Sequence, residues 1–155
     1  MIRRLVYTLL AASIAFLVQG CATLAPVTHT PIFAVQGERH ISPLVGTEVT
    51  VRGVVTAVVS RERDAGFFLQ DARGDGNPRT SDALFVDMAI RPAGELPSIG
   101  DYVEVTGTVE ERGRESQLSV TLIANAVVQA LRSGDPLPAP ISIGRGGRSI
   151  PVGSV

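Results

Sequence analysis

The feature that most constrains the fold is a pair of short apolar segments separated by an acidic segment rich in turn residues. Residues 66–71 read Gly-Phe-Phe-Leu-Gln-Asp and residues 83–87 read Ala-Leu-Phe-Val-Asp, and both are dense in residues that favour β-strands. Between them, residues 72–82 hold two glycines, a proline and several Asp and Asn residues, which break strands and helices. The stretch predicts a strand, a loop and a strand, and we expect the other strands to be arranged around this pair.

Three further segments predict strands, so we expect an all-β fold. Residues 47–60 are rich in valine and threonine, and Gly53 in their middle predicts a coil or bulge that lets one strand pair with two neighbours. Residues 101–110 alternate valine with polar residues, and residues 117–128 form the fifth strand, with an irregularity near Asn125. Five strands, antiparallel throughout, predict a five-stranded OB-type Greek-key barrel, with a β-sandwich as the second choice. Two stretches between strands read as a loop and a hairpin turn: residues 91–100 and 111–115.

The N-terminal residues predict export. Residues 1–20 form a signal peptide with a positive start and an apolar core too short for a comfortable membrane span. They end in Leu-Val-Gln-Gly before Cys21, the only cysteine, and this pattern resembles the bacterial lipobox. The resemblance implies that Cys21 is lipidated and, because Ala22 follows it, that the protein is anchored in the outer membrane. An ordinary secretory leader with a stray cysteine is the alternative.

Three regions follow the signal peptide. Residues 21–31 predict an extended, mobile, lipid-anchored tether, in which we expect His29 to be solvated. Residues 32–132 form the barrel domain. Residues 133–155 are rich in proline and glycine and read as a tail without a core of its own.

Charge and residue content exclude two classes of function. Arg3 and Arg4 lie in the leader, so 14 − 2 = 12 arginines remain against 15 acids, and the mature chain has a net charge of −3. This argues against a strongly basic, non-specific DNA-binding protein. A metal-dependent nuclease needs clustered carboxylates with a histidine on a rigid core, but the two histidines, His29 and His40, lie in expected loops. We therefore expect a non-catalytic protein without a cofactor, except that calcium remains a candidate metal ion.

The acidic loop is the candidate calcium site. Four of its side chains fall at positions 1, 5, 7 and 12 of an EF-hand-like count: Asp71, Asp75, Asn77 and Asp82. Gly76 occupies the tight-turn position, but Arg73 replaces the third ligand, and Asp82 is shorter than the usual glutamate. The alternative is a solvated turn in which Asp and Asn side chains cap the backbone.

The alternation of side chains also predicts a ligand face. Phe68 and Phe85 point outward on neighbouring strands, while four residues point inward: Phe67, Leu69, Leu84 and Val86. The loops after the first and fourth strands carry four arginines: Arg61, Arg63, Arg112 and Arg114. Aromatic platforms flanked by arginines bind single-stranded nucleic acid. In the alternative, one phenylalanine is core, residues 32–46 cover the other, and the arginines pair with nearby acids: Glu62, Asp64, Glu111 and Glu115.

Several motifs, in their order, resemble the OB-fold domain of large secreted bacterial nucleases. They span about residues 32–130: Val35–Gly37, Ser42–Thr56, Gly66–Asp71, Thr80–Asp82, Leu84–Val86, Ser98–Val109 and Gln117–Leu118. In that family the domain precedes a catalytic domain of the endonuclease/exonuclease/phosphatase type, for which this chain has no counterpart. The resemblance implies a nucleic-acid-binding accessory module, served by a separate nuclease or envelope protein. A structural or protein-interaction barrel of the envelope, and a truncated fragment of a larger nuclease, are the alternatives.

Overall fold

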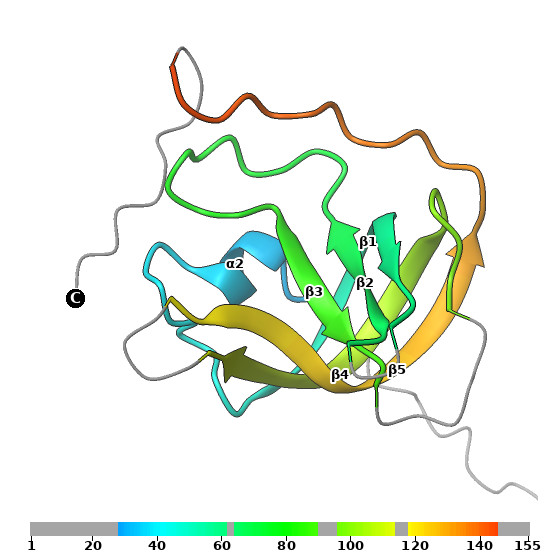
Figure 1. The fold of residues 1–155 in the computed structure, drawn as a ribbon, viewed down its shortest axis with the longest axis horizontal. Coiled ribbons are helices and arrows are strands. Elements are labelled where there is room, and N and C mark those ends of the chain that lie inside the picture. The colour runs from blue at the N-terminus through cyan, green and yellow to red at the C-terminus, as the bar shows by residue number, and fades with distance from the viewer. Residues whose placement is uncertain (1–27, 62–63, 90–95, 114–117, 146–155) are drawn as a thin grey trace, which may run out of the picture.

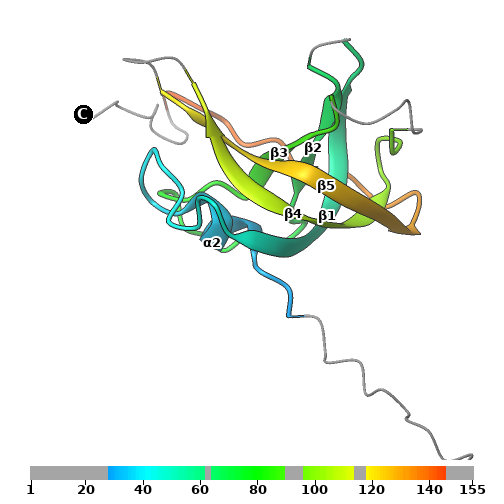
Figure 2. The ribbon, with the colours of Figure 1, turned by 90° about the horizontal axis from the view of Figure 1, so that it is seen from below.

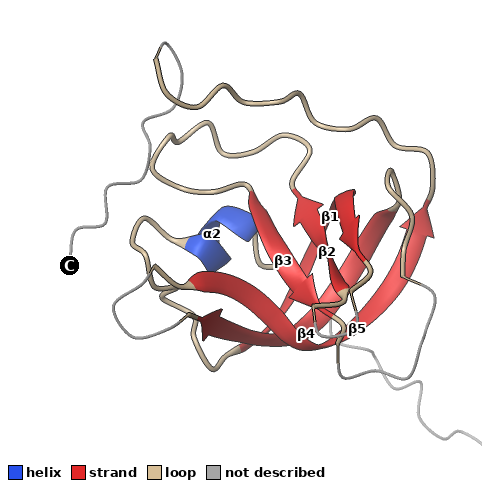
Figure 3. Ribbon diagram, in the orientation of Figure 1, coloured by secondary structure: helices blue, strands red, loops and turns tan. Residues whose placement is uncertain are grey.

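A computed structural model describes residues 28–61, 64–89, 96–113 and 118–145. The described part holds one short helix and five strands that form one closed barrel (Figures 1 and 3), so the all-β prediction is confirmed. Cys21, Arg63 and Arg114 lie outside the described residues. The elements are α2 (Ile32–Gln36), β1 (Glu48–Val59), β2 (Gly66–Gln70), β3 (Ala83–Asp87), β4 (Tyr102–Arg112) and β5 (Val120–Arg132).

Strand β1 serves two neighbours, as the mid-strand glycine predicted. Its first part, from Glu48 to Val54, pairs with β4, and its second part, from Val54 to Val59, pairs with β2. A Cβ atom at Gly53 would lie 2.6 Å from the carbonyl oxygen of Gln70, so only glycine lets β2 approach where the partners change. The bulge itself lies slightly later, between Val55 and Ala57.

The strand order corrects one sequence prediction. Around the barrel the order is β1-β2-β3-β5-β4, and β3 pairs with β5 in parallel rather than antiparallel. A closed ring with an odd number of strands cannot alternate direction all the way round, so at least one neighbouring pair must be parallel. The expectation of antiparallel neighbours throughout was therefore wrong for any closed five-stranded barrel.

Strands β4 and β5 form the longest antiparallel pair, and both extend beyond their predicted ends. The fourth strand continues to Arg112, so Glu111 and Arg112 belong to a strand and not to the predicted hairpin turn. In β5, Asn125 has a φ of 52°, and the register with β4 shifts between Thr106 and Thr108. The predicted irregularity near Asn125 is thus confirmed as a bulge.

The barrel core is aliphatic, and α2 contributes to it from the N-terminal side. Ile32 and Val35 are buried in the same cluster as the inward-facing strand residues. Figures 1 and 2 show α2 at one end of the barrel. Gln36 donates a hydrogen bond from Nε2 to the carbonyl oxygen of Ala83 at 2.7 Å, which ties α2 to the start of β3. Because α2 spans five residues, it is held by packing rather than by its own propensity.

Candidate nucleic-acid interface

The two outward phenylalanines meet on the outer face of β2 and β3. Phe68 pairs directly with Phe85 across the two strands, and the ring centroids lie 5.2 Å apart with the rings tilted by 57°. Phe68 is 40% exposed, whereas its neighbour Phe67 is fully buried in the core. The predicted alternation of these strands is confirmed, and it leaves an aromatic pair facing solvent.

The Phe85 ring packs against the backbone of β2. A Cβ atom at Gly66 would lie 2.5 Å from Cζ of Phe85, so the ring lies directly over the bare backbone of Gly66. Across the next strand pair, Phe85 lies opposite Leu122, which is buried although it is not part of the core cluster. The cross-strand row Ala57, Phe68, Phe85 and Leu122 therefore forms an apolar stripe over four strands.

The arginines differ in their surroundings. Arg112 forms an ion pair from Nη2 to Oδ2 of Asp87 on β3, and the Asp87 side chain is only 6% exposed. Asp87 is not one of the acids that lie near Arg112 in the sequence. The barrel brings the two residues together although they are 25 positions apart. Arg61 is exposed and has no ion pair within the described part of the chain.

The acidic loop is built from side chains that cap the backbone. Oδ1 of Asp71, Asp75 and Asn77 each accepts a hydrogen bond from the backbone N–H two residues later, at 2.8–3.0 Å. Oδ1 of Asp82 accepts one from the backbone N–H of Asp75 at 3.2 Å. This is the geometry of the capped-turn alternative. Among the described residues, no group of three or more His, Cys, Asp or Glu side chains is placed to hold a metal ion, and calcium binding stays a prediction.

The loop is also held from the N-terminal side. Arg79 forms an ion pair with Glu38 at 3.0 Å, and Nδ2 of Asn77 donates to Oε1 of Glu38 at 3.2 Å. The loop is thereby tied to the residues that follow α2.

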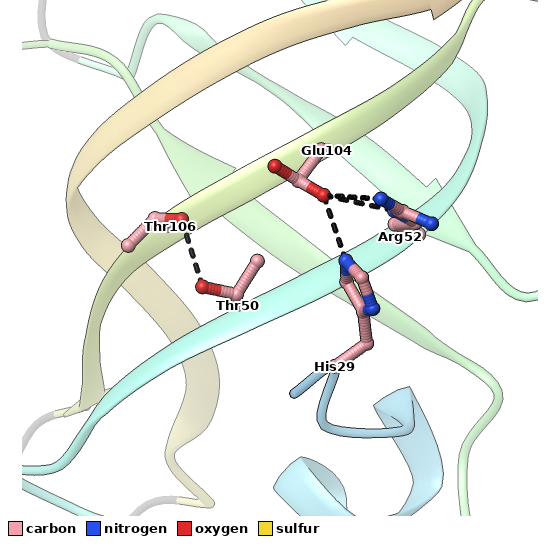
Figure 4. Close-up of polar contacts among 5 residues, drawn as sticks. All are labelled: His29, Thr50, Arg52, Glu104 and Thr106. Carbon is pink, nitrogen blue, oxygen red and sulfur yellow. Dashed lines mark hydrogen bonds and ion pairs between the residues drawn. The ribbon is translucent and has the colours of Figure 1, made fainter. Parts of the chain in front are cut away.

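A polar cluster that sequence reasoning missed lies on the outer face of β1 and β4 (Figure 4). Oε2 of Glu104 lies 2.7 Å from Nε2 of His29 and 2.8 Å from both Nε and Nη2 of Arg52. The hydrogen bond with His29, and then that with Arg52, lower the pKa of the Glu104 carboxyl. Arg52 and Glu104 are direct cross-strand partners, so a correct register alone would have revealed their pairing.

His29 was expected to be a solvated tether residue, and this was wrong. His29 contacts Glu104 through its side chain. The next residue, Thr30, donates its backbone N–H to the carbonyl oxygen of Thr50 at 2.8 Å. The last residues before α2 therefore lie against β1 instead of extending freely. The cluster joins a chain segment to the barrel. Its two basic side chains, of His29 and Arg52, share the carboxylate of Glu104, which fits a structural contact better than a catalytic site.

Glu111 is a half-buried residue that the sequence analysis assigned to a hairpin turn and that the structure places in β4. Its Oε1 accepts hydrogen bonds from the backbone N–H of Ser42 at 2.8 Å and from Oγ1 of Thr121 at 2.7 Å. Its Oε2 is buried without a partner in the described part of the chain. The side chain braces the segment after α2 against β5, which is a structural role.

No helix within the described ranges is long and apolar enough to cross a bilayer. Comparison of the chain with protein-family models, with curated proteins and with solved structures found no match in any of the three. A functional assignment therefore depends on the geometry of the barrel surface.

Proposed function

We propose that the domain is an OB-type barrel that binds single-stranded nucleic acid on the outer face of β2 and β3. The strand order β1-β2-β3-β5-β4, with a long coiled first strand shared by two neighbours, supports the OB-type assignment. In such barrels the ligand lies across strands two and three, between the loops after strands one and four.

The observation that carries the proposal is the Phe68–Phe85 pair on the outer face, in which Phe68 is exposed and Phe85 is half-buried. Two rings 5.2 Å apart, with Phe68 40% exposed, offer a platform to any base, because every base has a π-face. Stacking on such side chains is worth ~1–3 kcal/mol per base. Arg61 supplies an exposed positive charge in the loop after β1, and Arg112 keeps half of its side chain exposed beside Asp87. Because the chain carries a net negative charge, its affinity for nucleic acid is expected to be modest and salt-sensitive.

The experiment is a fluorescence-anisotropy titration of a labelled oligo-dT with the wild type and two alanine variants. Phe68→Ala is expected to weaken binding about 5- to 150-fold, from the stacking it removes. Val127→Ala is the matched control, since Val127 is 57% exposed on β5 and outside the aromatic stripe. Equal affinity of Phe68→Ala and the wild type, or no binding of the wild type at low salt, contradicts the proposal.

A protein-interaction barrel is the second candidate. It is favoured by the Arg112–Asp87 pair, which ties up one of the expected phosphate-binding cations. Two results together would establish it. The wild type would bind no oligonucleotide, and Phe68→Ala would lose an envelope protein partner that Val127→Ala retains.

We further propose that the protein is a non-catalytic lipoprotein of the outer membrane. The lipobox-like sequence before Cys21 supports the anchor. In a Gram-negative host the wild type is expected in the membrane fraction and Cys21→Ala in the soluble fraction, and a soluble wild type contradicts the anchor. Purified protein is expected to leave plasmid and single-stranded DNA intact with magnesium, manganese or calcium. Cleavage that is lost on mutating one acid of this chain would show an enzyme.

A further inference from the structure

A small pocket lies at the end of the aromatic face, between the sheet and the C-terminal tail. It is about 210 Å³ in volume. One side is formed by Gln70 at the end of β2, by Ser81 and Asp82 of the preceding loop, and by Ala83 at the start of β3. The other side is formed by Pro138–Ile141 of the tail. In Figure 1 the tail runs from the end of β5 across the loop between β2 and β3. Its start is fixed, because the backbone N–H of Asp135 donates to the carbonyl oxygen of Gly100 at 2.9 Å.

The pocket continues the aromatic stripe. Gln70 pairs with Ala83, which is the next cross-strand pair on the same face after Phe68 and Phe85. Two residues along a strand span about 7 Å. This is about twice the 3.4 Å rise per base of a stacked strand. A single strand that is extended and unstacked can therefore place one base on the rings and its neighbour in the pocket.

The lining suits one flat ring with a polar edge. A volume of about 210 Å³ lies below the ~300–1,000 Å³ of pockets for drug-sized ligands, so a single ring system is the expected occupant. The proline, alanine and isoleucine side chains of the tail give an apolar wall. The side-chain amide of Gln70 has no hydrogen bond within the described part of the chain, and it offers both a donor and an acceptor. Glutamine pairs in this way with N6 and N7 of adenine.

We propose that this pocket is a subsite for one base of the bound strand, that it prefers adenine, and that Gln70 reads the base edge. The inference rests on the proposed function, since it places a second base beside the one stacked on Phe68 and Phe85. It also gives the tail a role: Pro138–Ile141 complete the site instead of trailing from the barrel.

The test compares two labelled decamers, all-dT and dT with one central dA, titrated by fluorescence anisotropy. The single dA can settle in the pocket because the strand is free to shift along the face. The wild type is expected to bind the dA-containing decamer about 5- to 10-fold more tightly, the lower part of the range for one bidentate base contact. Gln70→Ala is expected to lose this preference but still bind all-dT.

Two tail variants test the wall. Ile141→Ala is expected to reduce the preference, and Leu137→Ala is the matched control, because both side chains are about half exposed but Leu137 does not line the pocket. If all-dT binds and depends on Phe68, yet the wild type shows no preference for dA, the subsite is refuted while the proposed function stands. If Gln70→Ala keeps the full preference, the subsite is likewise refuted. A wild type that binds neither decamer refutes both.

Discussion

Removing Arg112 should destabilise the barrel, although its place in the sequence predicts a phosphate contact. Its partner Asp87 is 6% exposed at the side chain, so Arg112→Ala leaves a buried carboxylate without its counter-ion. Removing one partner of a fully buried pair costs about 3–5 kcal/mol. Arg112 is 50% exposed, and Oδ1 of Asp87 keeps its hydrogen bond from the backbone N–H of Ala89 at 2.9 Å. We therefore expect about 1–3 kcal/mol.

The assay is urea unfolding followed by circular dichroism, with a thermal melt beside it. One kcal/mol shifts the melting temperature of a domain near 100 residues by about 4–8 °C, so a fall of about 4–24 °C is expected for Arg112→Ala. Arg61→Ala is the control, because Arg61 has no ion pair in the described part of the chain and its loss should leave stability within about 0.5 kcal/mol.

A double-mutant cycle completes the test. In the Asp87→Asn background the buried charge is gone. Arg112→Ala should then lower the free energy of unfolding by at least about 1 kcal/mol less than it does in the wild type. Equal stability of Arg112→Ala and Arg61→Ala, or additive effects in the cycle, would refute the argument that the pair stabilises the fold. Arg61→Ala is then also the variant in which to measure the salt dependence of oligonucleotide binding, since its fold is unperturbed.

Three further outcomes follow from burial, charge and close contact. In urea unfolding, Phe67→Ala should lower the free energy of unfolding by about 3–5 kcal/mol, and Phe68→Ala by about 1–2 kcal/mol because its ring is 40% exposed. Equal losses would show that the assignment of inward and outward side chains is wrong. The pKa of Glu104 is lowered in the fold, so its contribution is complete above its unfolded pKa of about 4.3 and is lost as pH falls through the lower folded value. When the free energy of unfolding is measured against pH, His29→Ala should reduce the stability that is lost at acid pH. An unchanged loss would contradict the role of His29. Gly53→Ala would place a Cβ 2.6 Å from the β2 backbone and should lower the melting temperature, and an unchanged melt would show that β2 can shift.

Much of the barrel could be predicted because each strand carries its own signal. Alternation placed Phe68 and Phe85 outward, a mid-strand glycine marked where β1 changes partners, and Asn125 marked the bulge in β5. These are local properties, readable from a few neighbouring residues.

The missed features depend on the path of the chain in space. Helix α2 has five residues, too few for a periodic pattern, and it is held by burial of Ile32 and Val35. The partner of Arg112 is 25 residues away, and that of His29 is 75 residues away. Neither contact can be inferred until the register of the barrel is known.

The parallel pair between β3 and β5 has a consequence for how the barrel folds and opens. Each antiparallel neighbour pair runs along much of its strands, whereas the register of the parallel pair joins Phe85 with Leu122 and Val86 with Ile123. This seam therefore has fewer registered residue pairs to hold it closed than any other neighbouring pair of strands in the described barrel. We expect this seam to form late and to open first, with the fastest amide hydrogen exchange among the paired strands. Because Phe85 lies on the seam, a strand bound across Phe68 and Phe85 would hold the barrel shut and slow that exchange.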